Sequence, residues 1–101
     1  MSLKRYASRK DDNHRAIVDM FRASGCSVQA LSESGCPDLL IGWKGHNILV
    51  EVKDGKKCAS ARRLTPAQEK WHRTWRGQVW VVESPEGVPV LLSQVKHGVE
   101  T

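Results

Sequence analysis

The sequence predicts a single α/β domain in which a helix, three strands, a second helix and a fourth strand follow one another along 101 residues. Two observations support this prediction. Apolar and polar residues alternate with a period of two on both sides of a turn at residues 44–47, as expected for a β-hairpin. Before and after this hairpin, apolar residues recur at spacings of three and four, which is typical of helices that pack on a sheet.

The first helix is predicted over residues 12–24. Asp11 or Asp12 would cap its start, and Gly25 would end it. Residues 1–10 are basic and polar, and we expect them to be flexible.

The remaining elements follow from turn and cap signals. Residues 27–32 are predicted to form a short strand before the hairpin. Thr65 and Pro66 are suited to begin a helix that Gly77 ends, and residues 78–83 form an apolar, β-branched strand. Because this strand follows a strand and a helix, we expect it to lie parallel in the sheet.

Two details of the packing are also predicted. Trp71 and Trp75 share one face of the second helix, and core packing against the sheet is the expected role for both. Residues 88–97 are predicted to form a short C-terminal helix, although residues 88–92 also fit a strand.

Three charged residues share one face of the predicted hairpin, namely Asp38, Glu51 and Lys53. Either a two-residue loop at 45–46 or a four-residue loop at 44–47 places Asp38 opposite Lys53 and puts Glu51 on the diagonal. At the roughly 7–8 Å between diagonal neighbours, the two carboxylates can converge on one cation.

This group has a plain chemical use. Hard oxygen ligands from Asp38 and Glu51, completed by waters and the backbone carbonyl of Val52, suit Mg²⁺ or Mn²⁺. Lys53 could orient a metal-bound water or stabilise developing charge. The alternative is an ordinary salt bridge between Asp38 and Lys53 on an exposed hairpin.

Pro37-Asp38, a hairpin and then Glu51-Val52-Lys53 resemble the PD-(D/E)xK nuclease motif, and nearly the whole chain resembles the small stand-alone VRR-NUC nucleases of phages and bacteria. The similarity includes residues 35–42, 51–55 and 64–68. It implies a restriction-endonuclease-like core of order αβββαβ, with a mixed sheet flanked by helices.

The resemblance also implies an activity, which is Mg²⁺- or Mn²⁺-dependent hydrolysis of a DNA phosphodiester. Stand-alone members look like Holliday-junction resolvases, so we expect a homodimer that cuts branched DNA. The alternatives are a nicking or general endonuclease in phage DNA processing, an RNA nuclease, and a basic DNA-binding module without catalysis.

Two further side chains are candidates for the site. Gln68 fits a capping box with Thr65, but the resemblance implies that it reaches the catalytic centre. Nucleases with this fold often carry an acidic residue on the first helix, where this chain has Asn13. A water held by Asn13 could bridge to the metal, a buried amide or cap is the alternative, and Asp12 and His14 are flanking candidates.

The chain is basic, with 16 Lys and Arg against 11 Asp and Glu and a pI near 9.4, which favours a polyanionic partner. The loop at residues 55–63 is predicted to be mobile and to contact phosphates through four cations: Lys56, Lys57, Arg62 and Arg63. His72 could also touch phosphate, or it could be a partly exposed histidine without a role.

Composition also bears on the compartment. Three cysteines without a CxxC pair argue against a disulfide framework or a zinc site and favour reducing conditions. The chain has no long apolar run, and its start lacks the apolar stretch of a signal peptide. We therefore expect a cytoplasmic protein that does not enter a membrane, and the resemblance to phage nucleases implies that a phage could encode it.

Overall fold

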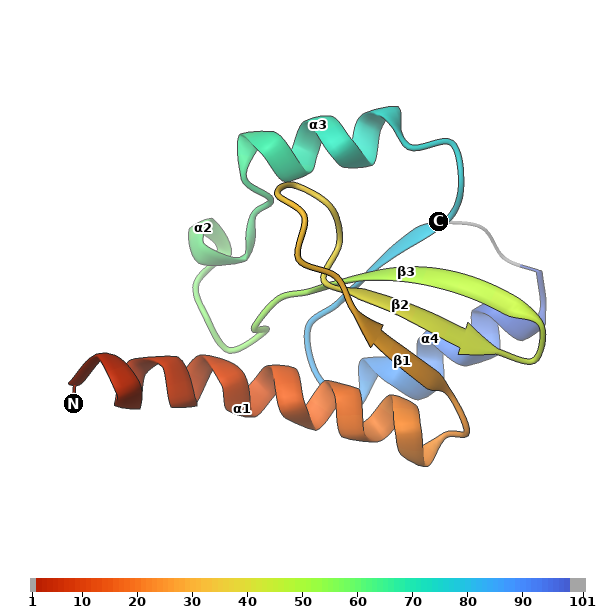
Figure 1. The fold of residues 1–101 in the computed structure, drawn as a ribbon, viewed down its shortest axis with the longest axis horizontal. Coiled ribbons are helices and arrows are strands. Elements are labelled where there is room, and N and C mark those ends of the chain that lie inside the picture. Colours follow the sequence, from red (N-terminus) through yellow and green to blue (C-terminus); the bar gives the residue numbers. More distant parts are fainter. Residues whose placement is uncertain (1, 99–101) are drawn as a thin grey trace.

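The structure is a computed structural model that describes residues 2–98, with the side chains of residues 12–60 and 62–98. Its elements, in chain order, are α1 (Ser2–Ala23), β1 (Ser27–Ala30), β2 (Leu39–Trp43), β3 (His46–Val52), α2 (Ala59–Arg62), α3 (Pro66–Thr74), β4 (Val79–Val82) and α4 (Gly87–Lys96) (Figure 1). The predicted αβββαβ order and the C-terminal helix are confirmed. The short helix α2 interrupts a segment that was predicted to be loop throughout.

The four strands form one mixed sheet in the order β1-β2-β3-β4. The first three strands are antiparallel neighbours, whereas β4 pairs in parallel with β3. The chain passes from β3 to β4 through α2 and α3, which is the helical crossover that a parallel pair needs. The parallel pairing predicted for residues 78–83 is therefore confirmed.

The register of the hairpin differs from both predicted alternatives. Trp43 pairs with His46, so the loop consists of Lys44 and Gly45. Both loop residues have positive φ, 49° and 82°, as a type I′ hairpin turn requires. Extended beyond the end of β2, this register places Asp38 opposite Glu51, and the prediction that Asp38 opposes Lys53 is wrong.

The turn supplies a test of this register. A Cβ at Gly45 would meet no atom within 4 Å, so Gly45→Ala should cause no steric clash. It should destabilise the protein only because alanine disfavours the φ of 82° at this position. We expect that variant to lose about 1–2 kcal/mol of unfolding free energy, measured by urea denaturation. Lys44→Asn is the matched control and should cost nothing, because Asn tolerates this backbone conformation. A Gly45→Ala protein with wild-type stability would contradict the type I′ turn.

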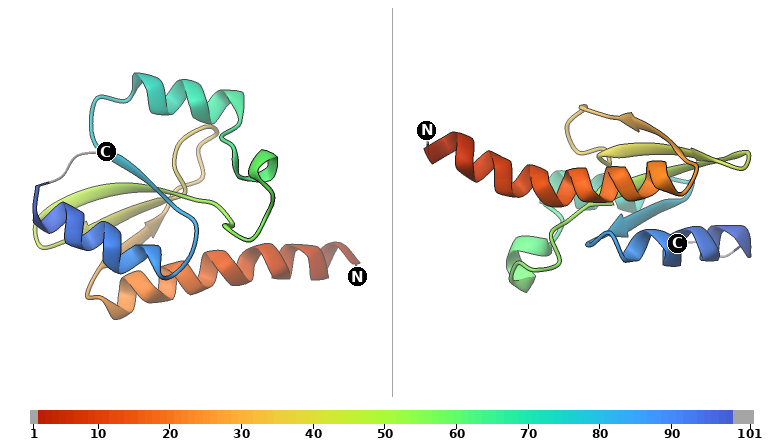
Figure 2. Two further views of the ribbon diagram at one scale, coloured as in Figure 1. Left: turned by 180° about the vertical axis from the view of Figure 1, so that it is seen from behind. Right: turned by 90° about the horizontal axis from the view of Figure 1, so that it is seen from below.

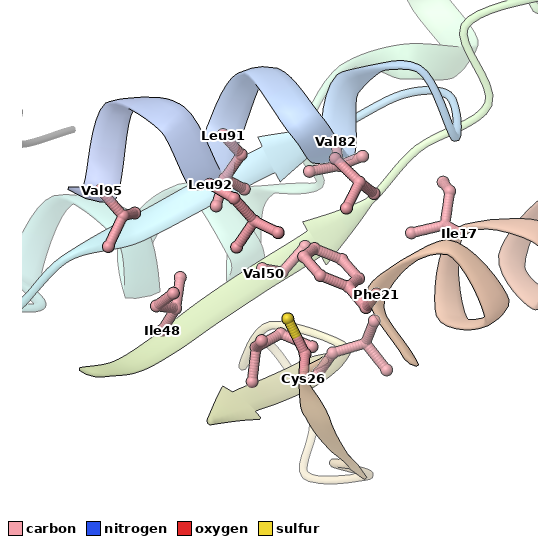
Figure 3. Packing of buried hydrophobic residues seen from close by; sticks show 12 residues of the cluster. Ile17, Phe21, Cys26, Ile48, Val50, Val82, Leu91, Leu92 and Val95 are labelled. Atoms are coloured by element: carbon pink, nitrogen blue, oxygen red, sulfur yellow. The ribbon is translucent and has the colours of Figure 1, made fainter. Parts of the chain in front are cut away.

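The hydrophobic core lies between one face of the sheet and the helices α1 and α4 (Figure 3). Ile17 and Phe21 of α1 are fully buried, and Ala16 and Met20 on the same side are partly buried, as the spacing of three and four between these apolar residues predicts. The rest of the buried cluster comes from the sheet, from α4 and from the start of β1: Cys26, Leu39, Ile41, Ile48, Val50, Val82, Val88, Leu91, Leu92 and Val95. This packing covers the apolar face of the hairpin. The opposite face, which carries Asp38, Glu51 and Lys53, does not pack against α1 or α4 and is available for a site.

The helix α1 begins earlier than predicted. It starts at Ser2, so a start capped by Asp11 or Asp12 is wrong, and residues 2–10, predicted to be flexible, have a helical backbone. No Gly or Pro interrupts residues 2–23, and nothing in that segment forces a helix to stop. The side chains of residues 2–11 lie outside the described part of the chain. The helix ends as predicted before Gly25, whose φ is 87°.

The helix α3 lies across the sheet from α1, above the connection between β1 and β2 (Figures 1 and 2). None of its nine residues, all with described side chains, is buried. Trp71 is half-buried, and Trp75, just past the helix end, is 47% exposed, so the predicted core packing of Trp75 is wrong. The helix also stops at Thr74, before Gly77.

Candidate active site

The end of the hairpin brings the two predicted carboxylates together. Asp38 directly precedes β2, and its Oδ2 accepts a hydrogen bond of 2.8 Å from the backbone N–H of Val52. Glu51 is only 2% exposed, although it carries an ionisable side chain. Asp38, Glu51 and Lys53 share one face of the hairpin because a register shift of two residues leaves the faces unchanged.

The environment of Glu51 strongly disfavours its charge. Burial, followed by the charge of the adjacent Asp38, raises the pKa of Glu51 from 4.5 to about 8, while Lys53 acts in the opposite direction. Its Oε1 is buried and has no hydrogen-bond partner among the described residues. A buried carboxylate oxygen without a partner, next to a second carboxylate, is what a cation site needs before a cation binds.

The side-chain amide of Gln68 links the other members of the site. Its Nε2 donates to Glu51 Oε2 at 3.0 Å, and its Oε1 accepts from Lys53 Nζ at 2.9 Å. Lys53 Nζ also lies 3.8 Å from Glu51 Oε2. The amide therefore holds the lysine ammonium beside the carboxylate. Its NH₂ group must point to the acceptor Glu51 and its oxygen to the donor Lys53, and this fixes the orientation of the amide.

Gln68 also caps the helix that carries it. Thr65 N donates to Gln68 Oε1 at 2.9 Å, and Gln68 N donates to Thr65 Oγ1 at 3.2 Å, which completes a capping box at the start of α3. The sequence presented the cap and a contact with the predicted site as alternatives. In the structure one amide makes both sets of contacts.

Asn13 reaches the site through the backbone. Its Nδ2 donates to the carbonyl oxygen of Lys53 at 3.0 Å, so the side chain ties α1 to the end of β3. The flanking candidate Asp12 is instead exposed and paired with Arg15 at 3.4 Å. Of the neighbours Asp12 and Asn13, Asn13 is the one with a hydrogen bond to a residue of the site.

The oxygen ligands present fit a divalent cation. Extended by one more pair, the hairpin register sets Pro37 opposite Val52, and proline has no N–H to offer the Val52 carbonyl. The N–H and C=O of one strand residue face the same neighbouring strand, so this carbonyl faces the side on which Asp38 lies. Asp38, Glu51 and the Val52 carbonyl would leave positions for water, as Mg²⁺ prefers. The described residues contain no group of three His, Cys, Asp or Glu side chains placed to hold a metal.

His72 lies one turn beyond Gln68 on α3. Its Nε2 is buried and, within the described part of the chain, has no hydrogen-bond partner. Burial and then the charge of Lys53 lower the pKa of His72 from 6.5, so the ring is neutral at pH 7. The imidazole is thus a neutral group close enough to Lys53 to be affected by its charge.

The predicted phosphate-binding cations are not equivalent. Lys56, Lys57 and Arg63 are exposed on the segment between β3 and α3. Arg62 differs from them, because it is half-buried and its Nη1 donates to Glu83 Oε2 at 3.2 Å.

A polar hollow that the sequence did not predict borders the site at Asn13. It has a volume of about 920 Å³ and is lined by Asp12, Asn13, Ala16, Asp54, Gly55, Lys56, Glu83, Ser84, Pro85 and Glu86. These residues come from α1 and from the segments that follow β3 and β4, so only the folded chain brings them together.

A mixed sheet whose hairpin joins Asp38, Glu51 and Lys53, completed by Gln68 from a crossover helix, defines an α/β domain of the restriction-endonuclease-like type. Among solved structures, the chain is similar to one described as a VRR_NUC domain, with 31% identity and a TM-score of 0.65 over 82% of this chain and 92% of the other. The chain belongs to the VRR-NUC family of nuclease domains, as its sequence motifs predicted. No family model and no curated protein matched the sequence.

Within residues 2–98, no helix combines the length and the apolar character needed to cross a bilayer.

Proposed function

We propose that the protein is a metal-dependent endonuclease that hydrolyses DNA phosphodiester bonds. The main support is the arrangement of Glu51, a buried carboxyl group whose Oε1 has no partner among the described residues and whose Oε2 is joined to Lys53 through Gln68. A solvated surface ion pair needs no such burial, so the alternative of an ordinary salt bridge loses its support.

Each residue of the site has a role in this proposal. Asp38, Glu51 and the Val52 carbonyl would hold Mg²⁺ or Mn²⁺, which when bound supplies Lewis acidity and an acidified water. Lys53 places its positive charge where the phosphate becomes more negative, and Gln68 keeps the ammonium there. Asn13 fixes the backbone of Lys53, which makes it a positioning residue, and it could also hold a water beside the metal.

Further contacts would hold the DNA. Lys56, Lys57 and Arg63 are exposed cations next to the site and are suited to phosphates. Arg62 can join them only by leaving Glu83. His72 lies one turn beyond Gln68, and its Nε2 can bond a phosphate oxygen only if the side chain moves to uncover this buried atom.

We further propose a homodimer that acts on branched DNA, such as a Holliday junction, because paired cuts require two active sites. The domain is small and leaves apolar surface uncovered, including Val81 on the edge strand β4, which is 48% exposed. A nicking or general endonuclease is the second candidate.

Cleavage of a labelled four-way junction and of a linear duplex of matching sequence tests this proposal. The assay compares wild type with Lys53→Ala in Mg²⁺, in Mn²⁺ and in chelator. We expect symmetric, metal-dependent cuts in the junction that Lys53→Ala does not make. Cutting of both substrates would reject the junction specificity. Binding without cutting in any metal would identify a basic DNA-binding module.

The two contacts of Gln68 can be separated by mutation. Thr65→Ala removes the cap alone and should cost about 1 kcal/mol of stability with cleavage nearly unchanged. Gln68→Ala removes the cap and also releases Lys53 and Glu51, so cleavage should fall by about 10- to 100-fold. Urea denaturation and single-turnover cleavage measure the two effects. Equal cleavage by both variants would mean that Gln68 only caps the helix.

A further inference from the structure

Trp75 is an exposed aromatic side chain held in a fixed position. Its ring stacks on Trp71 with centroids 4.6 Å apart and planes 15° apart, yet 47% of the residue remains exposed. Gly77 supports this position, because a Cβ there would come within 2.9 Å of Trp75 Nε1. Next to the ring lies a hollow of about 310 Å³, lined by Thr74, Trp75, Arg76 and Gly77.

The position of this ring relative to the active site follows from the helix that it caps. Trp75 comes seven residues after Gln68, which is close to two turns, and its backbone N–H still donates to Trp71 O at 3.0 Å, so both residues lie on the same face. At 1.5 Å per residue, the two are separated by roughly 10 Å along the axis. A DNA strand that rises about 3.4 Å per nucleotide would cover this distance in about three nucleotides.

The charges around Trp75 favour a nucleic acid as its partner. Arg76 lines the same hollow as Trp75, the exposed Lys70 and Arg73 make the opposite side of the helix basic, and Glu69 is the acidic residue of residues 66–77. Exposed aromatic rings among cations are the usual means of binding single strands, because every base has a face that can stack. A second copy of the chain is disfavoured here, since two such helices would place like charges against each other.

We propose that Trp75 is a stacking platform for an unpaired base of the DNA substrate, about three nucleotides from the scissile phosphate. This inference rests on the proposed nuclease function and deepens it. According to this proposal, the protein recognises an unpaired nucleotide near the cleavage site as well as the phosphates.

The test uses a splayed-arm duplex with 2-aminopurine at successive positions of one single-stranded arm. Binding is measured by fluorescence in chelator, so that the DNA stays intact. Wild type should quench the probe at about three nucleotides from the cut, which is located separately in Mg²⁺. Trp75→Ala should lose this quenching and bind the splayed arm about 10-fold more weakly, whereas Trp75→Phe should retain most of both. Val90→Ala, another exposed apolar residue, on α4, is the control.

Two results would overturn the proposal. One is unchanged quenching and affinity in Trp75→Ala, with folding verified by thermal denaturation. The other is a Trp75→Ala protein that sediments as a smaller species than wild type and whose affinities for paired and for unpaired DNA fall by the same factor. That result would assign the ring to an interface between two copies of the chain. Wild type that stacks the probe but never cleaves in Mg²⁺ or Mn²⁺ would reject the nuclease function and leave the stacking supported.

Discussion

Glu51→Gln is expected to stabilise the metal-free protein while it abolishes cleavage. Glu51 is 2% exposed and burial is the largest cause of its raised pKa, so at pH 8 the native state either buries a charge or retains a proton. A neutral amide of the same shape avoids this cost and can still accept the hydrogen bond from Gln68. We expect a gain of about 1–3 kcal/mol in unfolding free energy, measured by urea denaturation in chelator.

The same substitution should reduce the rate of cleavage by roughly 10³-fold or more, because a metal ligand worth several kcal/mol in the transition state is lost. Glu33→Gln, which changes an exposed carboxylate in the connection between β1 and β2, is the matched control and should alter neither quantity. A Glu51→Gln protein that is less stable than wild type would show that the ionised carboxylate contributes to the fold, and the burial argument would fail.

The stability of the metal-free protein should fall as the pH rises from about 6 to about 8. Glu51 keeps its proton up to about pH 8 in the folded protein, against an ordinary pKa of 4.5. Between these values the folded state binds one proton more than the unfolded state, so the unfolding free energy decreases by at most about 1.4 kcal/mol per pH unit. Above pH 8 the contribution of Glu51 is constant.

His72 has the opposite effect at lower pH. Its pKa is lowered from 6.5, so below that pH the unfolded chain takes up a proton more readily than the folded chain, and the contribution of His72 to stability falls as the pH decreases. Below about pH 6.5 this slope offsets the opposite slope of Glu51, so the two groups together predict a plateau in stability there and a decline above it. Thermal denaturation from pH 5 to pH 9 in chelator measures this profile.

Mg²⁺ should reverse the loss at high pH. The ion binds an ionised carboxylate, so binding releases the proton of Glu51, and the stabilisation by Mg²⁺ should be larger at pH 8 than at pH 6. Glu51→Gln is the control, because its stability should neither fall between pH 6 and pH 8 nor increase when Mg²⁺ is added. A wild-type profile that is flat from pH 6 to pH 8 would contradict the raised pKa of Glu51.

The sequence predicted the faces of the hairpin but not its register, for a physical reason. Alternation of apolar and polar residues determines which side chains share a face, and a slip of two residues leaves that pattern unchanged. The register depends on the loop, and the loop that forms needs φ of 49° at Lys44, which residues other than Gly, Asn and Asp seldom adopt. The charged residues of the site were therefore predictable, whereas the opposition of Asp38 and Glu51 was not.

The prediction for Trp75 failed for a different reason. Helical spacing shows that Trp71 and Trp75 share a face, but it cannot show whether the opposing surface is close enough to cover that face. Gln68 illustrates the opposite case, because it makes both the cap contacts and the contacts with Glu51 and Lys53, and no pattern in the sequence says that one amide can make both sets. The polar hollow beside Asn13 was not predictable because distant segments form it.

The absence of buried residues along α3, all of whose side chains are described, has a consequence for motion. The helix is held to the sheet side of the site largely through the polar contacts of Gln68 and the close approach of Ala67 to Gly35. We expect it to open as a local unit at a free-energy cost well below that of global unfolding, with fast amide exchange. The site is thus divided between a rigid hairpin and a helix that detaches easily, and bound metal and DNA would bridge the two parts.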